Sequence, residues 1–186
     1  LDAILAVLAK PAQALAPPRP VQPPAFTEAE LDTLLEQLQG EDHPLRVATA
    51  RRLMAANLEK LGAKLLPAAL RLADEIDPTL RMLGANVLAK AALPEHVPIL
   101  LHMLQEEARG QQPQAIEALG RIRDKRSIQP MADLIASGSE ASAAAAEALS
   151  DFGPVVEEAA LRLLKEKHAE TRRPACRLLL KSGTAK

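Results

Sequence analysis

The chain has 186 residues, of which 48% are hydrophobic, and its formal net charge is −1. A chain of this length can bury a continuous core, and its balanced charge gives it no overall attraction to nucleic acid or acidic lipid. Because it contains two Phe and no Tyr or Trp, the core must be filled by aliphatic side chains, which favours closely packed helices over strands. We therefore expect an all-α fold. No apolar run reaches about 18 residues, so no membrane span is expected.

Cys176 is the only cysteine, which excludes an intrachain disulfide and leaves the redox compartment undetermined. A small apolar side chain among leucines is more often core filler than nucleophile, so we expect Cys176 to be buried. The first residue is Leu1 rather than Met, which indicates a module of a larger or processed protein.

The N-terminal part divides into a short apolar helix over residues 1–10 and a proline-rich linker over 11–26. The segment PAQALAPPRPVQPP has no acidic residue and favours extended polyproline II structure. Its PxxP spacings also leave open a role as a ligand of an SH3-like domain.

The short helix would place Ile4, Leu5 and Leu8 on one apolar side. A helix of this length is not stable alone in water, so we expect these side chains to pack against the first helices of the following domain. A long tether also permits exchange between two molecules. The expected state is therefore a monomer or an arm-swapped dimer.

A run of punctuated helices begins after Phe26. Thr27 and Glu30 form a capping box, which predicts a helix from residue 28 to the stop at Gly40. The leucines of its apolar face are Leu31, Leu34, Leu35 and Leu38. Further helix breaks are predicted at Asp42–Pro44, Lys60–Gly62, Asp77–Pro78, Leu93–Pro94, Arg109–Gly110, Asp124–Lys125, Ser137–Ser139, Gly153–Pro154 and His168–Ala169.

A short pattern recurs five times in this part of the chain. The copies are LRVATARRL (45–53), LRMLGANVL (80–88), QQPQAIEAL (111–119), ASAAAAEAL (141–149) and TRRPACRLL (171–179). Each copy ends in leucine, and a pair of small or short residues precedes that leucine by four and three positions. The spacings are 35, 31, 30 and 30 residues. Repetition at such a period predicts a solenoid, in which each helix pair buries its apolar face against the next pair.

The helices before these copies also share an apolar face. Three of them carry a proline, at positions 67, 98 and 130, which we place in the first turn of each helix, where a missing N–H is tolerated. The paired pattern resembles HEAT repeats, in the short form first associated with phycobilisome lyases. This resemblance covers residues 27–183 and implies an α-solenoid domain over 27–186. Its helix pairs would occupy approximately 27–58, 62–92, 94–123, 125–152 and 154–183.

In HEAT repeats, an arginine early in the second helix and the aspartate before that helix commonly form a ladder between adjacent repeats. The resemblance therefore implies structural ion pairs of Asp42 with Arg46 and of Asp77 with Arg81.

The ladder is expected to be incomplete in the later repeats. Repeats three and four have Gln112 and Ser142 at the arginine position, and repeat five keeps Arg172 but has His168 in place of the aspartate. Stacking there would rest on Ala and Leu contacts, which makes the alanine-rich fourth repeat the predicted weakest link.

The row of second helices is the surface to inspect for binding. A helical wheel places one set of side chains on the outward side of this row. The candidate binding residues are Arg51, Asn86, Lys90, Glu117, Arg121, Glu147, Asp151, Arg177 and Lys181. Their charges alternate in sign, whereas a surface that binds the phosphate backbone of nucleic acid needs clustered Lys and Arg. The pattern indicates a protein or peptide partner and no nucleic acid, with a merely solvated face as the alternative.

One local charge excess remains at the C-terminus. Residues 162–186 carry a local charge of +6, which suits the polar cap of a terminal repeat or, alternatively, an acidic partner.

The residue types give little support for an enzymatic function. The four histidines are scattered and suit helix caps or solvent better than metal, so no metal and no cofactor is expected. The chain also lacks the aromatic platform of a base-binding repeat protein. The sequence therefore predicts a non-catalytic protein-interaction scaffold. The alternatives are a phycobilisome-lyase-like enzyme or chromophore chaperone and a HEAT-like nucleic-acid binder.

Overall fold

The computed structural model describes residues 25–105 and 110–182, and these residues form helices without any strand. The predicted helix over 1–10, nearly all of the linker and the expected packing of Ile4, Leu5 and Leu8 lie outside the described residues. None of the helices in the described part is long and apolar enough to cross a membrane.

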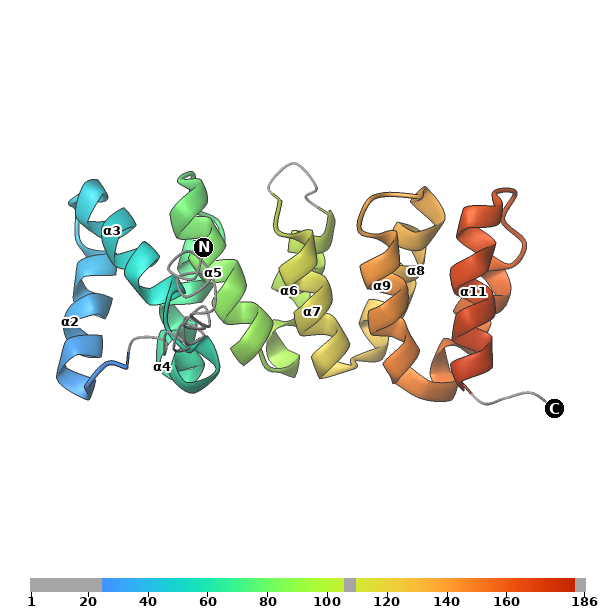
Figure 1. Ribbon diagram of the computed structural model, residues 1–186, viewed down its shortest axis with the longest axis horizontal. Helices are drawn as coiled ribbons and strands as arrows, with labels where there is room; N and C mark the ends of the chain where they lie inside the picture. The colour runs from blue at the N-terminus through green and yellow to red at the C-terminus, as the bar shows by residue number, and fades with distance from the viewer. Residues whose placement is uncertain (1–24, 106–109, 183–186) are drawn as a thin grey trace, which may run out of the picture.

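The described helices follow one another as pairs. The pairs are α2 (Glu28–Gln39) with α3 (His43–Met54), α4 (Leu58–Leu72) with α5 (Pro78–Ala91), α6 (Val97–Gln105) with α7 (Gln112–Ile122), α8 (Ile128–Ser137) with α9 (Ser142–Leu149), and α10 (Glu157–Leu163) with α11 (Ala169–Ser182). Short 3-10 turns precede three of the first helices: η1 (Pro94–His96), η3 (Lys125–Ser127) and η4 (Ser150–Val156). Successive pairs stand side by side, with α5, α7, α9 and α11 in one layer (Figure 1). The predicted all-α solenoid is confirmed.

The start of α2 follows the predicted capping box. Thr27 N donates to Glu30 Oε2 at 2.9 Å, and Glu30 N donates to Thr27 Oγ1 at 3.3 Å. These bonds satisfy amide groups that have no partner inside the helix. The helix ends at Gly40, as predicted.

The predicted break at Lys60–Gly62 is wrong. Helix α4 begins at Leu58, because the Asn57 side chain accepts hydrogen bonds from the amides of Glu59 and Lys60. Gly62 lies inside the helix, where an added Cβ would be 2.6 Å from Ala91 Cβ. The glycine therefore permits close packing of α4 on α5 and does not end a helix.

The earlier start of α4 also changes the position of one proline. Pro98 and Pro130 lie in the first turn of α6 and α8, as expected. Pro67 lies in the interior of α4, so the prediction of a first-turn proline is wrong for this helix.

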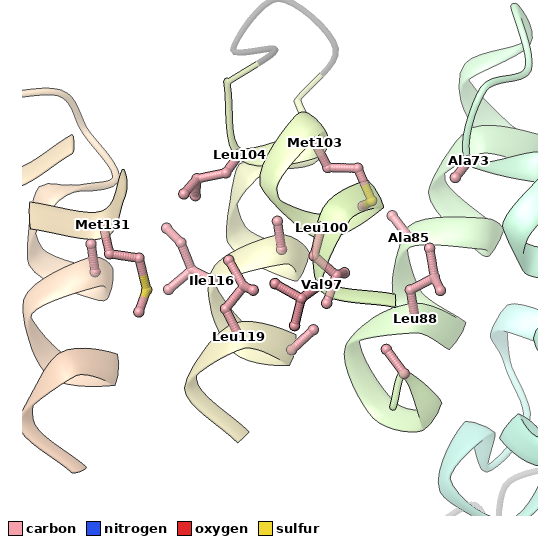
Figure 2. Packing of buried hydrophobic residues seen from close by; sticks show 14 of the residues in the cluster. Ala73, Ala85, Leu88, Val97, Leu100, Met103, Leu104, Ile116, Leu119 and Met131 are labelled. Atoms are coloured by element: carbon pink, nitrogen blue, oxygen red, sulfur yellow. The ribbon is translucent and has the colours of Figure 1, made fainter. Parts of the chain in front are cut away.

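The hydrophobic core runs without interruption through the stack. Figure 2 shows side chains of α5, α6, α7 and α8 packed in one layer, with Val97, Leu100 and Leu119 near its centre. The closing leucines of the first four pattern copies are fully buried, whereas in the last copy Leu178 is buried and Leu179 only partly. The apolar repeat seen in the sequence is therefore the core of the solenoid.

Small residues allow the close approach of helices, although the closest approach occurs inside a pair. A Cβ on Gly84 of α5 would lie 2.7 Å from Ala73 N and 2.8 Å from Ala69 O, at the end of α4. The absence of a side chain at Gly84 thus lets the backbone of α5 touch the backbone of α4.

Cys176 is exposed, and the prediction that it is buried is wrong. The corresponding residues Ala50, Ala85 and Ile116 of the first three pairs are buried, and Ala146 is half-buried. This position faces the following pair, and no described helix follows α11 to cover it.

Candidate protein-interaction surface

The arginines early in the second helices bind backbone carbonyl groups at the end of the first helix or in the loop that follows it. Arg46 Nε donates to Leu38 O at 2.9 Å, and Arg81 Nη1 donates to Glu75 O and Ile76 O at 2.8 and 2.9 Å. Leu38 lies in the last turn of α2, where carbonyl groups lack partners within the helix and the helix dipole favours a cation. Glu75 and Ile76 lie in the loop between α4 and α5.

Arg172 occupies the same place in the fifth pair. Its Nη1 atom donates to Glu166 O at 3.0 Å and to Lys167 O at 2.6 Å. His168, at the position of the missing aspartate, accepts backbone bonds through its carbonyl from Thr171 N and Arg172 N.

The aspartates have a different task from the ion pairing that was expected. The Asp42 side chain accepts from Leu45 N at 3.1 Å, and Asp77 accepts from Thr79 N and Leu80 N at 2.8 and 3.1 Å. The hydrogen bond from Leu80 N is the main cause that lowers the pKa of Asp77. These carboxylates cap the second helices, whereas the arginines bind carbonyl groups in the last turn of the first helix or in the loop between the two helices.

Contacts between the first and second pairs use other partners. The Arg46 guanidinium reaches the Glu75 carboxylate, and His43 Nε2 lies 3.3 Å from Asp77 Oδ2. An inter-repeat ladder therefore exists here, but with pairings that the sequence pattern did not predict.

Sequence reasoning missed two further members of this arrangement. Gln112 Nε2 donates to Leu104 O at 2.8 Å, and Ser142 Oγ donates to Leu134 O at 3.1 Å. Both residues stand at the arginine position of their repeats, so in all five pairs a side-chain donor at this position binds a backbone carbonyl of the first helix or of the loop after it. The five aligned copies of the recurring pattern contained this information, because Arg, Gln and Ser side chains can all donate a hydrogen bond.

The candidate binding residues, here called the second-helix row, lie on the surface of the second helices and the adjoining turns. All of them are exposed except Asn86, which is half-buried. In the first half of the row, side chains bind across successive pairs: Lys90 Nζ lies 2.5 Å from Glu117 Oε1, and Asn86 Oδ1 accepts from Gln114 Nε2 at 3.1 Å. The hydrogen bond to Glu117 is the main cause that raises the pKa of Lys90.

Other members of the row are also bound to the protein itself. Arg121 Nη2 donates to Ala92 O at 2.5 Å and its Nε to Ala89 O at 3.3 Å, so this guanidinium binds the end of α5. Lys181 Nζ lies 3.3 Å from Asp151 Oδ1. These contacts neutralise much of the charge along the row.

Three charged side chains of the row have no ion pair or side-chain hydrogen bond within the described residues: Arg51, Glu147 and Arg177. Glu147 and Arg177 line a depression of about 370 Å³ between α9 and α11. The exposed Ala143 and the half-buried Ala146 line the same depression and leave room for an incoming side chain.

A second depression of about 370 Å³ lies between α7 and α9. Glu147 lines this depression as well, together with Glu117 and Asp151. The concave part of the row therefore lies over α7, α9 and α11, and Glu147 borders both depressions.

The described residues include no group of three or more His, Cys, Asp or Glu side chains that could hold a metal ion. His96 Nδ1 accepts from Leu93 N at 3.0 Å and so caps the turn before α6. The pKa shifts within the described part arise at helix caps and surface ion pairs.

Residues 65–150 match a protein-family model described as HEAT repeats. This stretch extends from within α4 to the end of α9. A search of curated proteins finds no match to the chain.

Proposed function

Because the chain is a HEAT-repeat protein, we propose that it is a non-catalytic scaffold module that binds a protein or peptide over α7, α9 and α11. HEAT repeats generally mediate protein–protein interaction. The solenoid presents its second helices as an extended surface, which suits a partner that contacts several repeats at once.

One observation supports the choice of α7, α9 and α11 as the binding surface. Glu147 and Arg177 are exposed, have no ion-pair partner within the described residues, and face a depression beside small alanine side chains. Lys90 and Glu117, by contrast, already bind each other, and the unpaired Arg51 lines neither depression. Unpaired charges beside a concave surface support binding of a partner with complementary charges.

The alternation of charge supports a polypeptide partner. A carboxylate at Glu147 repels a phosphate backbone, whereas a peptide with both basic and acidic side chains can pair with Glu147 and Arg177 together. We infer that the bound segment carries both signs of charge within the reach of one helix pair.

A photo-crosslinking experiment tests this proposal. A photoreactive amino acid replaces the exposed Ala143 in the full chain, expressed in its native cells, and crosslinked products are identified by mass spectrometry. We expect one dominant protein adduct, and we expect the double reversal Glu147→Lys with Arg177→Glu to remove it, because both ion pairs with the partner become repulsive.

The matched controls use surface positions outside both depressions. Arg51→Glu reverses an exposed, unpaired charge of the same row on α3, and the photoreactive residue at Ala29 samples the exposed surface of α2. The adduct should persist with Arg51→Glu and should not form from Ala29. The absence of an adduct from position 143, or equal yields from positions 143 and 29, would contradict the proposal.

A further inference from the structure

A second concave surface lies in the layer of first helices, between α8 and α10. This outer groove has a volume of about 840 Å³ and is separate from the second-helix row. Ile128 and Ala159 line it from these two helices; Ala159 is buried and Ile128 partly buried against the core.

Two large apolar side chains in the outer groove remain exposed. Val155 is 46% exposed and Leu161 is 47% exposed. Aligning the first helices places Ser127 and Asp133 at the corresponding positions of the fourth pair. Ser127 Oγ donates to Asp124 O, and Asp133 carries an ion pair. The fifth pair thus has apolar side chains where its neighbour has polar ones, and clustered apolar exposure is typical of an interaction site.

The backbone keeps Val155 in the groove. Gly153 has φ 72°, a left-handed conformation that glycine adopts without strain, and Pro154 follows it. This turn lets η4 bury Phe152 and Val156, while Val155 lies on the other side of the chain.

Positive charge surrounds these apolar side chains. Lys125 and Lys165 line the groove, are exposed and have no ion pair within the described residues. Arg162 is held by Asp133, whose Oδ1 lies 2.7 Å from Arg162 Nη2 and also accepts from Gln129 Nε2 at 2.8 Å. This contact links α8 to α10 across the groove.

We propose that the outer groove binds an acidic amphipathic helix of another protein. The apolar side chains of that helix contact Val155 and Leu161, and its carboxylates lie near Lys125 and Lys165. A groove recognises an amphipathic helix by contacting the apolar face of that helix and by presenting charges opposite to those that flank the face. Glu158 is the single carboxylate among the lining residues, so the groove favours an acidic partner. The proposal concerns a surface that the function proposed above does not use.

The test uses two synthetic four-turn helical peptides and the full chain. Both peptides carry the same leucine stripe, and the remaining positions are Glu in one and Lys in the other. Amide chemical shifts locate binding, and fluorescence anisotropy measures affinity. We expect the Glu peptide to perturb the amides of residues 125–129 and 155–165 and to bind at least about tenfold more tightly than the Lys peptide.

Three variants make the assignment specific. Leu161→Gln should weaken binding of the Glu peptide by about tenfold, and Lys125→Glu with Lys165→Glu should reverse the preference between the peptides. Leu180→Gln is the matched control, since Leu180 is 84% exposed on α11 and does not line the groove. All of these side chains are exposed, so the circular dichroism and melting temperature should remain those of the wild type.

The proposal is overturned if neither peptide binds, if both bind equally, or if the perturbed amides lie elsewhere. It is also overturned if sedimentation shows a dimer that Leu161→Gln dissociates, because a second copy would then cover the groove. None of these outcomes bears on the crosslink from position 143, so the two proposals fail separately.

Discussion

In every described pair, the side chain at one position of the second helix donates to a backbone carbonyl of the first helix or of the loop between the helices. Arg81 is half-buried and binds two carbonyl groups, and Gln112 is buried and binds one. Because an unpaired buried carbonyl costs about 1–3 kcal/mol, Gln112→Ala should lower the free energy of unfolding by about that amount. Arg81→Ala should lower it by less, because one of its carbonyl partners is part-buried and the other is exposed. Urea denaturation measures the loss. Arg51→Ala, an exposed and unpaired arginine, should change stability by less than about 0.5 kcal/mol. Equal, small effects in all three variants would make the donor position dispensable.

The pKa of Asp124 gives a second test at the scale of a residue. Hydrogen bonds from the side chain and then the backbone of Arg126 lower this pKa to about 2. Because this pKa is lower in the folded state than its ordinary value of 3.8, the ionised Asp124 stabilises the fold at pH values above 3.8. This stabilisation is lost as the pH falls through about 2. An NMR titration of the Asp124 carboxyl should have its midpoint near 2. Arg126→Ala should raise the midpoint but keep it below 3.8, because residue 126 still donates its amide; a full return to 3.8 would show that this amide bond contributes nothing.

At the scale of an element, the contact between α4 and α5 depends on Gly84. A methyl group there would lie within 3 Å of backbone atoms of Leu72 and Ala73, and these atoms cannot move without displacing the end of α4. Gly84→Ala should therefore lower the free energy of unfolding by about 1–3 kcal/mol, as overpacking does. Thermal or urea unfolding measures the effect. Gly40→Ala is the control, since Gly40 has φ −66° and the added Cβ would lie 3.5 Å from Gln37 O, an ordinary contact distance. A neutral Gly84→Ala would mean that α4 and α5 can move apart at no cost.

Over the whole molecule, stability should be lower toward the C-terminal pairs. Helix α5 buries Leu80, Leu83 and Leu88, whereas the eight-residue α9 buries only Ala145 and Leu149. In a solenoid each pair is stabilised mainly by its neighbours, so a short helix with little buried area opens locally before the rest. Hydrogen exchange followed by mass spectrometry should therefore show faster exchange in α9 than in α4 and α5. Equal protection across these helices would indicate one cooperative unit and would contradict the weak fourth repeat.

Local patterns in the sequence determined the architecture. The capping box of Thr27 and Glu30, the recurring leucines and the period of about 30 residues predicted helix pairs that stack, and the structure has them. These features could be predicted because each depends on residues within one or two turns of the same helix, or on a spacing that repeats along the chain.

Contacts between helices were decided only by the tertiary structure. Gly62 was predicted to end a helix, but the approach of Ala91 gives it a packing role. Cys176 was predicted to be buried, but its exposure depends on whether another pair follows. The partners of Arg81 and the pairing of Lys90 with Glu117 likewise depend on atoms from other helices. Spacing along one helix shows which face a side chain occupies, whereas its bonding partner is set by the packing of helices that are distant in the sequence.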